Sequence, residues 1–136
     1  MRQDLTKRAD YAIRTVLALA RAAPGEPLSV RRVANEQRIP ERFLSQVMRD
    51  LVRARLVEGT VGRSGGYRLA KPAMAISLLE VVEAVEGDSH RRVCVLRGGP
   101  CALDGVCDVH RVFAAAQDDV LGRLRATTVA AVILAG

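Results

Sequence analysis

The sequence lacks the features that mark membrane, secreted and disulfide-rich proteins. No apolar run approaches the roughly 20 residues of a membrane-spanning helix, and no apolar stretch follows the charged residues 1–8 as it would in a signal peptide. Cysteine is absent outside residues 94–107, so no disulfide framework spans the chain. Internal repeats and low-complexity segments are also absent. We therefore expect a cytoplasmic protein with no membrane contact, whose 136 residues suffice to bury about two-thirds of the unfolded surface in one integrated domain.

Acidic residues are scarce in the first half of the chain. Residues 1–72 hold 15 Lys and Arg against 7 Asp and Glu, whereas residues 73–136 hold 6 against 8. Nearly all of the basic residues are Arg, whose planar guanidinium binds phosphates and guanine edges with two hydrogen bonds at once. This charge distribution indicates that the first half contacts an anion, and nucleic acid is the anion that such a distribution favours.

Three cysteines are concentrated in one short segment. They are Cys94, Cys101 and Cys107, and His110 follows three positions after the last. Three thiolates and one imidazole form a complete four-ligand set for a soft metal or an iron–sulfur cluster. Their spacing is wider than the Cys-x2–4-Cys knuckles of structural zinc sites, which favours iron–sulfur over zinc. Buried core cysteines, or a disulfide with one thiol left over, are the less favoured alternatives.

The apolar periodicity predicts three helices in the first half. The first runs from Leu5 to Ala22, with Ile13, Val16, Leu17 and Ala20 at helical spacing. Ser29 is a suitable N-cap for a short second helix in which Val33 and Ala34 are buried. After a turn at residues 38–40 the third helix begins near Glu41, and its predicted inward residues are Phe43, Leu44, Val47, Met48 and Leu51. Two short helices around a tight turn, the second exposing Arg, Ser and Gln, predict a helix–turn–helix.

The rest of the chain predicts a hairpin and further helices. Residues 56–61 and 67–70 are strand-like, and the glycine-rich residues 62–66 between them form a tip that lets the backbone approach DNA closely. A helix is predicted over residues 76–86. A long helix from about Val109 to Leu124 carries an apolar stripe that we expect to pack against a second copy of the chain. The apolar residues 127–134 are expected to fold back onto this long helix. The stripe consists of Val109, Val112, Phe113, Ala116, Val120, Leu121 and Leu124.

Four segments together resemble the Rrf2 family of bacterial regulators. They are the opening residues 5–14 (LTKRADYAIR), the Ile39-Pro40-x-x-Phe43-Leu44 entry to the third helix, the wing residues 62–69 (GRSGGYRL) and the cysteine segment. The resemblance covers essentially the whole chain. IscR-like, NsrR-like and RirA-like members of the family are dimeric winged-helix proteins that bind DNA and respond to an iron–sulfur cluster. The resemblance therefore implies a homodimer, a DNA operator and a cluster held by the three cysteines.

The resemblance offers two candidates for the fourth cluster ligand. In IscR-like members the ligand is a His three residues after the third Cys, and His110 matches it. In NsrR-like members it is an Asp from the first helix of the partner subunit, and Asp10 stands at that place. His110 is favoured, because the Asp-Tyr pair at positions 10 and 11 also occurs in members that bind no cluster. The first cysteine spacing is one residue longer than in IscR and NsrR, so a two-iron and a four-iron cluster both stay open.

These patterns predict a mainly α protein with a small β-hairpin wing. Residues 1–72 form the winged helix–turn–helix, residues 73–108 a connecting helix and the cysteine loop, and residues 109–136 the dimerisation helix and tail. The expected function is that of a homodimeric transcriptional regulator, most simply a repressor, and not an enzyme. Zinc or thiol oxidation in place of a cluster is the alternative, and an iron–sulfur redox protein is a distant one, since no nucleotide-binding loop accompanies the cysteines.

The expected DNA contacts fall into three groups, and no small-molecule substrate is implied. The first group reads base edges in the major groove, the second enters the minor groove from the wing tip, and the third binds phosphates. In this order the groups are Arg42, Ser45, Gln46 and Arg49; Arg63 with Ser64; and Arg31, Arg32, Arg53 and Arg68.

Overall fold

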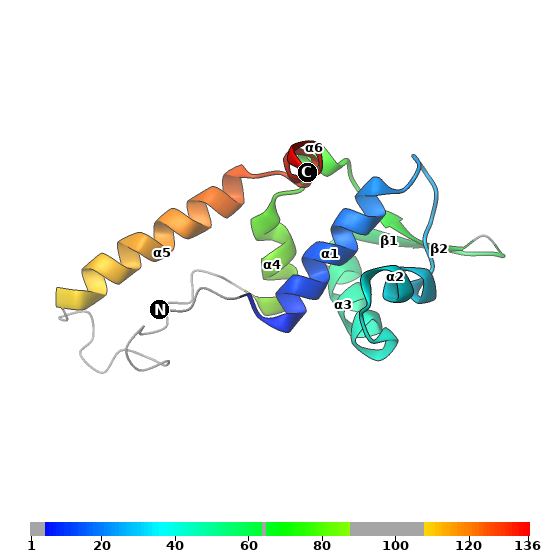
Figure 1. The fold of residues 1–136 in the computed structure, drawn as a ribbon, viewed down its shortest axis with the longest axis horizontal. Helices are drawn as coiled ribbons and strands as arrows, with labels where there is room; N and C mark the ends of the chain where they lie inside the picture. The colour runs from blue at the N-terminus through cyan, green and yellow to red at the C-terminus, as the bar shows by residue number, and fades with distance from the viewer. Residues whose placement is uncertain (1–4, 64, 88–107) are drawn as a thin grey trace.

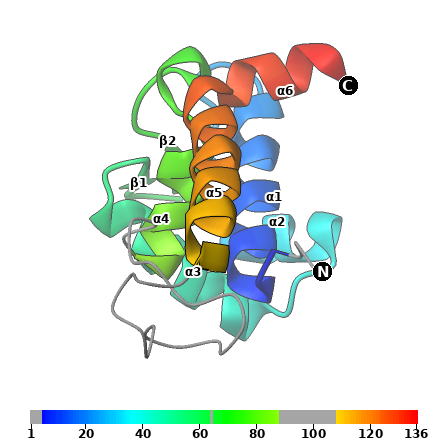
Figure 2. The ribbon, with the colours of Figure 1, turned by 90° about the vertical axis from the view of Figure 1, so that its left-hand side faces the viewer.

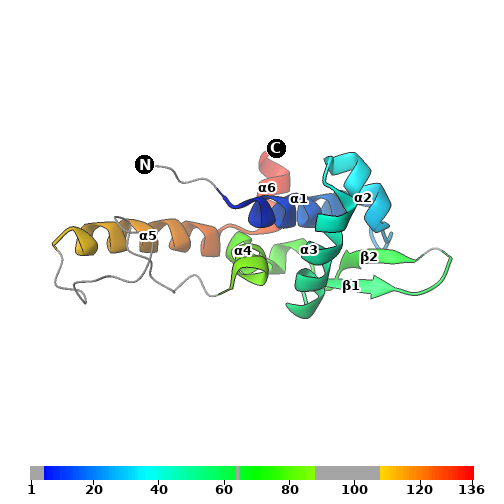
Figure 3. The same ribbon diagram turned by 90° about the horizontal axis from the view of Figure 1, so that it is seen from below.

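The computed structural model describes residues 5–63, 65–87 and 108–136. Within these ranges the chain is mainly helical with one antiparallel hairpin, as predicted (Figure 1). The wing strands and helix α5 project from opposite ends of a body formed by the other helices (Figure 3). The elements in chain order are α1 (Lys7–Arg21), α2 (Val30–Gln37), α3 (Glu41–Arg53), β1 (Val57–Thr60), β2 (Gly66–Leu69), the 3-10 helix η1 (Ala73–Ala75), α4 (Leu78–Glu86), α5 (Asp108–Ala126) and α6 (Val129–Ala135).

Polar caps explain where several helices begin. The Ser29 hydroxyl accepts a hydrogen bond from the Arg32 amide at 3.1 Å, which confirms its predicted role as the N-cap of α2. Helix α4 begins two residues later than predicted, because Ser77 and Glu80 form a capping box. The Ser77 hydroxyl accepts from the Glu80 amide at 3.1 Å, and the Glu80 carboxylate accepts from the Ser77 amide at 2.8 Å. Ile76, just before the cap, is extended and fully buried.

One hydrophobic core joins the helices of the body. Helix α1 buries a face of small residues that includes Ala9, Ala12 and Val16, so that it packs closely against α4. Of the four positions predicted by periodicity, Val16 is fully buried, whereas Ile13, Leu17 and Ala20 lie partly buried at the edge of the core. The largest fully buried side chains are Leu44, Met48, Leu51, Ile76, Val16, Val33, Val47, Val57, Val81, Val129 and Thr15.

The prediction that Phe43 faces inward is wrong. Leu44 and Val47 fill the core side of α3, while Phe43 lies on the flank of the helix that faces α1 and is 50% exposed. Its ring makes an edge-to-face contact with Tyr11, with 6.3 Å between the ring centroids. Phe43 therefore covers the outside of the α1–α3 contact.

The hairpin is fixed to the body by a third segment. In the β1–β2 register Gly59 lies opposite Tyr67 and Thr60 opposite Gly66. Leu28, just before α2, pairs with the other side of Tyr67, because the Leu28 amide donates to the Tyr67 carbonyl at 2.9 Å and the Tyr67 amide donates to the Leu28 carbonyl at 2.7 Å. Gly66 allows this approach, since a Cβ there would lie 2.6 Å from the Leu28 carbonyl oxygen. The wing is thus held in a fixed position beside the start of α2.

Helix α5 stands apart from the core. It contacts α4, but none of its residues is buried, and Val112 is 68% exposed. The predicted helix is confirmed, but the prediction that the tail folds back along it is wrong. Helix α6 packs against α1 and η1, because Val129 is fully buried and its amide donates to the Ile76 carbonyl at 2.8 Å. In the described part of the chain no helix has the length and apolar character to cross a membrane.

Candidate nucleic-acid interface and metal ligands

Helices α2 and α3 and the turn between them form the predicted helix–turn–helix. The turn contains Arg38 in the left-handed region (φ 53°), followed by buried Ile39 and by Pro40, which precedes the first residue of α3. The Ile39 amide donates to the Ala34 carbonyl at 3.0 Å, which closes the end of α2. Because Ile39 is anchored in the core, the direction of α3 relative to α2 is fixed.

The exposed face of α3 carries polar and cationic side chains. Leu44, Met48 and Leu51 anchor the opposite face, which leaves the residues predicted to read base edges pointing outward. The Ser45 hydroxyl donates to the Glu41 carbonyl at 3.0 Å within the helix. The exposed residues of this face are Arg42, Ser45, Gln46, Arg49 and Arg53.

The arginines predicted to contact DNA differ in how far they are already neutralised. Within the described ranges, Arg31, Arg42, Arg49 and Arg63 form no ion pair, whereas Arg53 lies 3.9 Å from Asp50. Four of the arginines therefore keep an unneutralised charge that suits a phosphate or a guanine edge.

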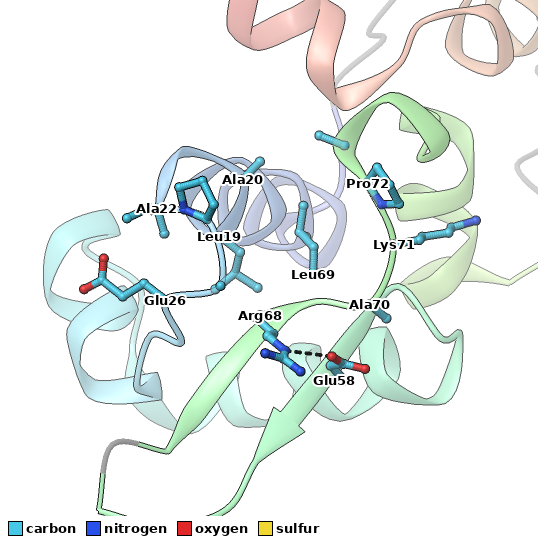
Figure 4. Close-up of a pocket in the computed structure, with 14 residues that line it drawn as sticks. Leu19, Ala20, Ala22, Glu26, Glu58, Arg68, Leu69, Ala70, Lys71 and Pro72 are labelled. Carbon is cyan, nitrogen blue, oxygen red and sulfur yellow. Dashed lines mark hydrogen bonds and ion pairs between the residues drawn. The ribbon is translucent and has the colours of Figure 1, made fainter.

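Besides Arg53, two more of the predicted phosphate contacts have carboxylate partners, at shorter distances. Arg32 donates to Glu36 at 2.9 Å and to Glu26 at 3.2 Å, and hydrogen bonding by Glu36 first, then by Glu26, raises the pKa of Arg32. Arg68 donates to Glu58 at 2.7 Å across the hairpin (Figure 4). Part of the charge of these two side chains is compensated within the protein, so each is a weaker candidate for phosphate binding than Arg31.

The wing presents Arg63 next to a tightly built turn. The Thr60 hydroxyl accepts from the Gly66 amide at 2.9 Å and donates to the Gly66 carbonyl at 3.2 Å, which closes the base of the tip. Gly65 has no room for a side chain, because a Cβ there would lie 2.6 Å from the Thr60 carbonyl oxygen. Arg63 is exposed, and Ser64 lies outside the described residues.

Only part of the predicted metal-ligand set lies in the described ranges. Cys94, Cys101 and Cys107 fall outside them, and the described residues include no group of three potential metal ligands. His110 lies in the first turn of α5 and is partly buried, and Asp10 lies in the first turn of α1. The donor chemistry fits an iron–sulfur cluster, since three thiols are available beside one imidazole or one carboxylate.

The two candidates for the fourth ligand lie on different helices that do not meet at these ends. Within one protomer the start of α5 lies away from the start of α1 (Figures 1 and 3). Figure 2 views the same arrangement from the α5 side, with α5 in front of α1 and α4. Asp10 and His110 of one protomer are therefore not brought together.

The residue pattern overlooked Arg14. Its guanidinium donates to Asp10 at 2.9 Å and to the Gln37 carbonyl at 2.6 Å, and it lies over the Tyr11 ring, 5.2 Å from the centroid. Arg14 thus connects the candidate ligand Asp10 to the end of α2. The sequence does indicate the Asp10–Arg14 pair, because oppositely charged residues four positions apart on one predicted helix are neighbours on its surface.

A helix–turn–helix with a free cationic face on its second helix and a hairpin beside it defines a winged-helix DNA-binding protein. The chain belongs to the Rrf2 family, described as iron-dependent transcriptional regulators, whose family model matches residues 5–135. The relatives are named as regulators, in agreement with the expectation of a protein that is not an enzyme.

Individual relatives agree with this assignment. The chain is 34% identical over 132 residues to the transcriptional regulator NsrR of Shouchella clausii, covering 96% of this chain and 89% of that one. It is 37% identical over 83 residues to a helix–turn–helix type regulator of Mycobacterium tuberculosis, and that match covers 61% of this chain and about half (52%) of the relative. The structure of CymR, described as the global cysteine regulator of Bacillus subtilis, superposes with a TM-score of 0.83 at 23% identity, covering 99% of both chains.

Proposed function

We propose that the protein is a homodimeric repressor that binds a pseudo-palindromic DNA operator and whose binding is switched by an iron–sulfur cluster. The observation that carries the DNA-binding part is the set of exposed arginines on α3 and the wing, Arg42, Arg49 and Arg63, which form no ion pair within the described residues. In this proposal Arg42, Ser45, Gln46 and Arg49 contact base edges, and Arg63 with Ser64 enters the minor groove. The phosphate contacts are those of Arg31, Arg32, Arg53 and Arg68.

The dimer is proposed to form through α5. Its apolar side chains include Val109, Val112 and Val120, which are 41%, 68% and 39% exposed in the single chain. A helix with such a stripe and no buried residue gains free energy when a second copy covers it. The two-fold axis of such a dimer would present two α3 helices to two half-sites of the operator.

The cluster ligands are proposed to be Cys94, Cys101, Cys107 and His110, with Asp10 of the partner subunit as the alternative fourth ligand. When bound, the cluster supplies a group that reacts with nitric oxide or oxidants and that depends on iron supply. The cysteines lie in the sequence between α4 and α5, and α4 packs against both α1 and α3. Helix α4 therefore connects the segment that contains the cysteines to the recognition helix α3.

The DNA-binding proposal is tested by the salt dependence of affinity. With six to ten phosphate contacts per dimer, the logarithm of the affinity for a duplex selected from a random pool should fall with the logarithm of salt concentration with a slope of about −5 to −9. Fluorescence anisotropy measures this slope in potassium chloride from roughly 50 to 300 mM, the range in which such slopes are resolved. A slope near zero contradicts the proposal.

The cluster proposal is tested on protein purified under nitrogen. Visible absorption with stoichiometric iron and sulfide is expected, and substitution of any one of the three cysteines by Ala should abolish it. A colourless protein that contains zinc would instead support the zinc alternative.

A further inference from the structure

A cavity of about 390 Å³ lies between α3 and the wing. Residues from α2, α3 and the two wing strands line it, and they include no carboxylate. They are Val30 at the start of α2, Ser45, Arg49 and Val52 on α3, and Gly59 and Tyr67 on the wing strands.

A second cavity on the far side of the wing provides a comparison. It is lined by Glu26, Glu58, Arg68 and Lys71 together with apolar residues (Figure 4). Both of its cations are neutralised, since Arg68 is 2.7 Å from Glu58 and Lys71 is 2.9 Å from Glu80. The α3–wing cavity differs because its cation, Arg49, has no acidic partner among the described residues. Of the two, it is the one suited to an anion.

Tyr67, which lines this cavity, has backbone pairing partners on both sides. Its backbone is hydrogen-bonded to Leu28 in both directions, at 2.9 and 2.7 Å, and it pairs with Gly59 on the other side. The Tyr67 ring lies beside Gly59, where a Cβ would be in ordinary van der Waals contact with Tyr67 Cε1 at 3.5 Å. A side chain fixed in this way loses little conformational entropy when it contacts a ligand.

The position of the cavity identifies the anion. When a recognition helix occupies the major groove and a wing enters the neighbouring minor groove, one sugar–phosphate strand runs between the two elements. That strand crosses the surface between α3 and the wing, where the cavity opens. Arg49 lies two turns into α3, beyond the N-terminal residues that usually reach base edges.

We infer that the α3–wing cavity is a seat for one backbone phosphate of the DNA strand that separates the two grooves, with Arg49 and the Tyr67 hydroxyl as donors. This inference rests on the proposed function. It adds Tyr67, which carries no charge, to the DNA contacts, and it assigns Arg49 to a phosphate instead of a base edge. Because a phosphate contact carries no sequence information, its loss weakens binding equally for different sequences.

The test uses the protein as purified under nitrogen and a duplex that the wild type selects from a random pool. Tyr67→Phe keeps the ring against Gly59 and removes only the hydroxyl, so affinity should fall about three- to tenfold for this duplex and for mutated duplexes alike. Tyr11→Phe removes the other phenol hydroxyl of the chain and is the matched control, with unchanged affinity expected. Gly59→Val, which fills the cavity, should lower affinity at least as much while circular dichroism stays that of the wild type.

Replacement of single phosphates by neutral methylphosphonates locates the contact. One position between the grooves of each half-site should weaken wild-type binding and have a smaller effect on Tyr67→Phe. Equal losses in both proteins at every position, or wild-type affinity of Tyr67→Phe, contradict the inference while leaving DNA binding intact. If the wild type selects no duplex, the proposed function itself fails.

Discussion

Asp10 and Arg14 lie one turn apart on α1 and form an ion pair, with Arg14 Nη2 2.9 Å from Asp10 Oδ2. Arg14 is held from two further sides, by the Gln37 carbonyl and by the face of the Tyr11 ring. The Asp10 carboxylate thus already has a cationic partner within its own protomer. If Asp10 served as a cluster ligand for the partner subunit, this pair would have to rearrange.

The first prediction concerns the fourth ligand. His110→Ala should give colourless protein after purification under nitrogen. The His110 imidazole follows Cys107 by three positions, and the described residues contain no other histidine that could replace it as a ligand. Asp10→Ala should keep its visible absorption, since its carboxylate is bound by Arg14. Absorption and Mössbauer spectra after reconstitution measure both outcomes.

The reverse result would assign Asp10 as the ligand and make the cluster a bridge between subunits. Asp10→Asn serves as the control for folding. Its thermal stability should be close to that of the wild type, because the pair is partly exposed to solvent, and ion pairs near the surface contribute only about 0–1 kcal/mol.

The second prediction concerns the wing tip. Arg63→Ala should weaken operator binding by about 1–3 kcal/mol, mostly at A·T-rich flanks. The narrow minor groove of such flanks has a strongly negative potential that attracts the guanidinium, and alanine loses this attraction. Val61, on the same tip and fully exposed, provides the control Val61→Ala, for which no change is expected. Anisotropy titrations on footprinted DNA compare the two, and equal affinities would exclude a role for Arg63.

The third prediction concerns α5. Val112→Glu combined with Val120→Glu should raise the dimer dissociation constant at least a hundredfold, because an unpaired buried charge costs about 3–5 kcal/mol. Ala115→Glu combined with Gly122→Glu adds the same charges to exposed positions of α5 outside the apolar stripe and should leave the dimer intact. Light scattering across a concentration series distinguishes them. A full dimer in the first variant would mean that another surface makes the contact.

Much of the fold follows from local signals in the sequence. The Ser29 cap, the apolar spacing of α3 and the glycine-rich tip each predict a local structure that needs no distant partner. The outward residues of α3 were predictable for the same reason. A helix buries one stripe, so the polar residues between the stripe positions must face solvent.

The errors come from long-range packing. Phe43 has the spacing of a core residue, but the Tyr11 ring provides a partner on the flank of α3. The apolar character of the tail and of α5 predicts that they pack together, whereas the Val129 amide donates to the Ile76 carbonyl and so fixes the tail beside η1. The α3–wing cavity was also beyond prediction, since it depends on Leu28 holding Tyr67 from a segment 39 positions away in the sequence.

The fourth prediction concerns acid stability. Burial of Glu80 opposes its ionisation, but hydrogen bonds from the Ser77 amide and from Lys71 outweigh it, so the pKa of Glu80 lies below its ordinary value. A carboxyl whose pKa is lower in the folded state stabilises the fold above its unfolded pKa of about 4.3. This contribution disappears as the pH falls through the folded pKa. Glu80→Gln should therefore destabilise the protein at pH 7 and have little effect well below pH ~4.

Urea unfolding of the wild type and of Glu80→Gln at both pH values measures this difference. Glu83→Gln on the same helix is the control, because the Glu83 carboxylate has no hydrogen-bond partner among the described residues. A stability loss for Glu80→Gln that is equal at both pH values would show that the charge of Glu80 does not matter.

The last prediction concerns backbone strain in the helix–turn–helix. Arg38 ends α2 in the left-handed region, at φ 53°, where a side chain costs about 1–2 kcal/mol and glycine adopts the conformation freely. Arg38→Gly should raise the free energy of unfolding by about 0.5–1 kcal/mol, after allowance for the greater entropy of glycine in the unfolded chain. Arg38→Ala keeps a Cβ in the strained conformation and should give no gain, so a comparison of the two by urea unfolding isolates the backbone effect from the loss of the guanidinium. Equal stabilities of the Gly and Ala variants would show that the turn relaxes without strain.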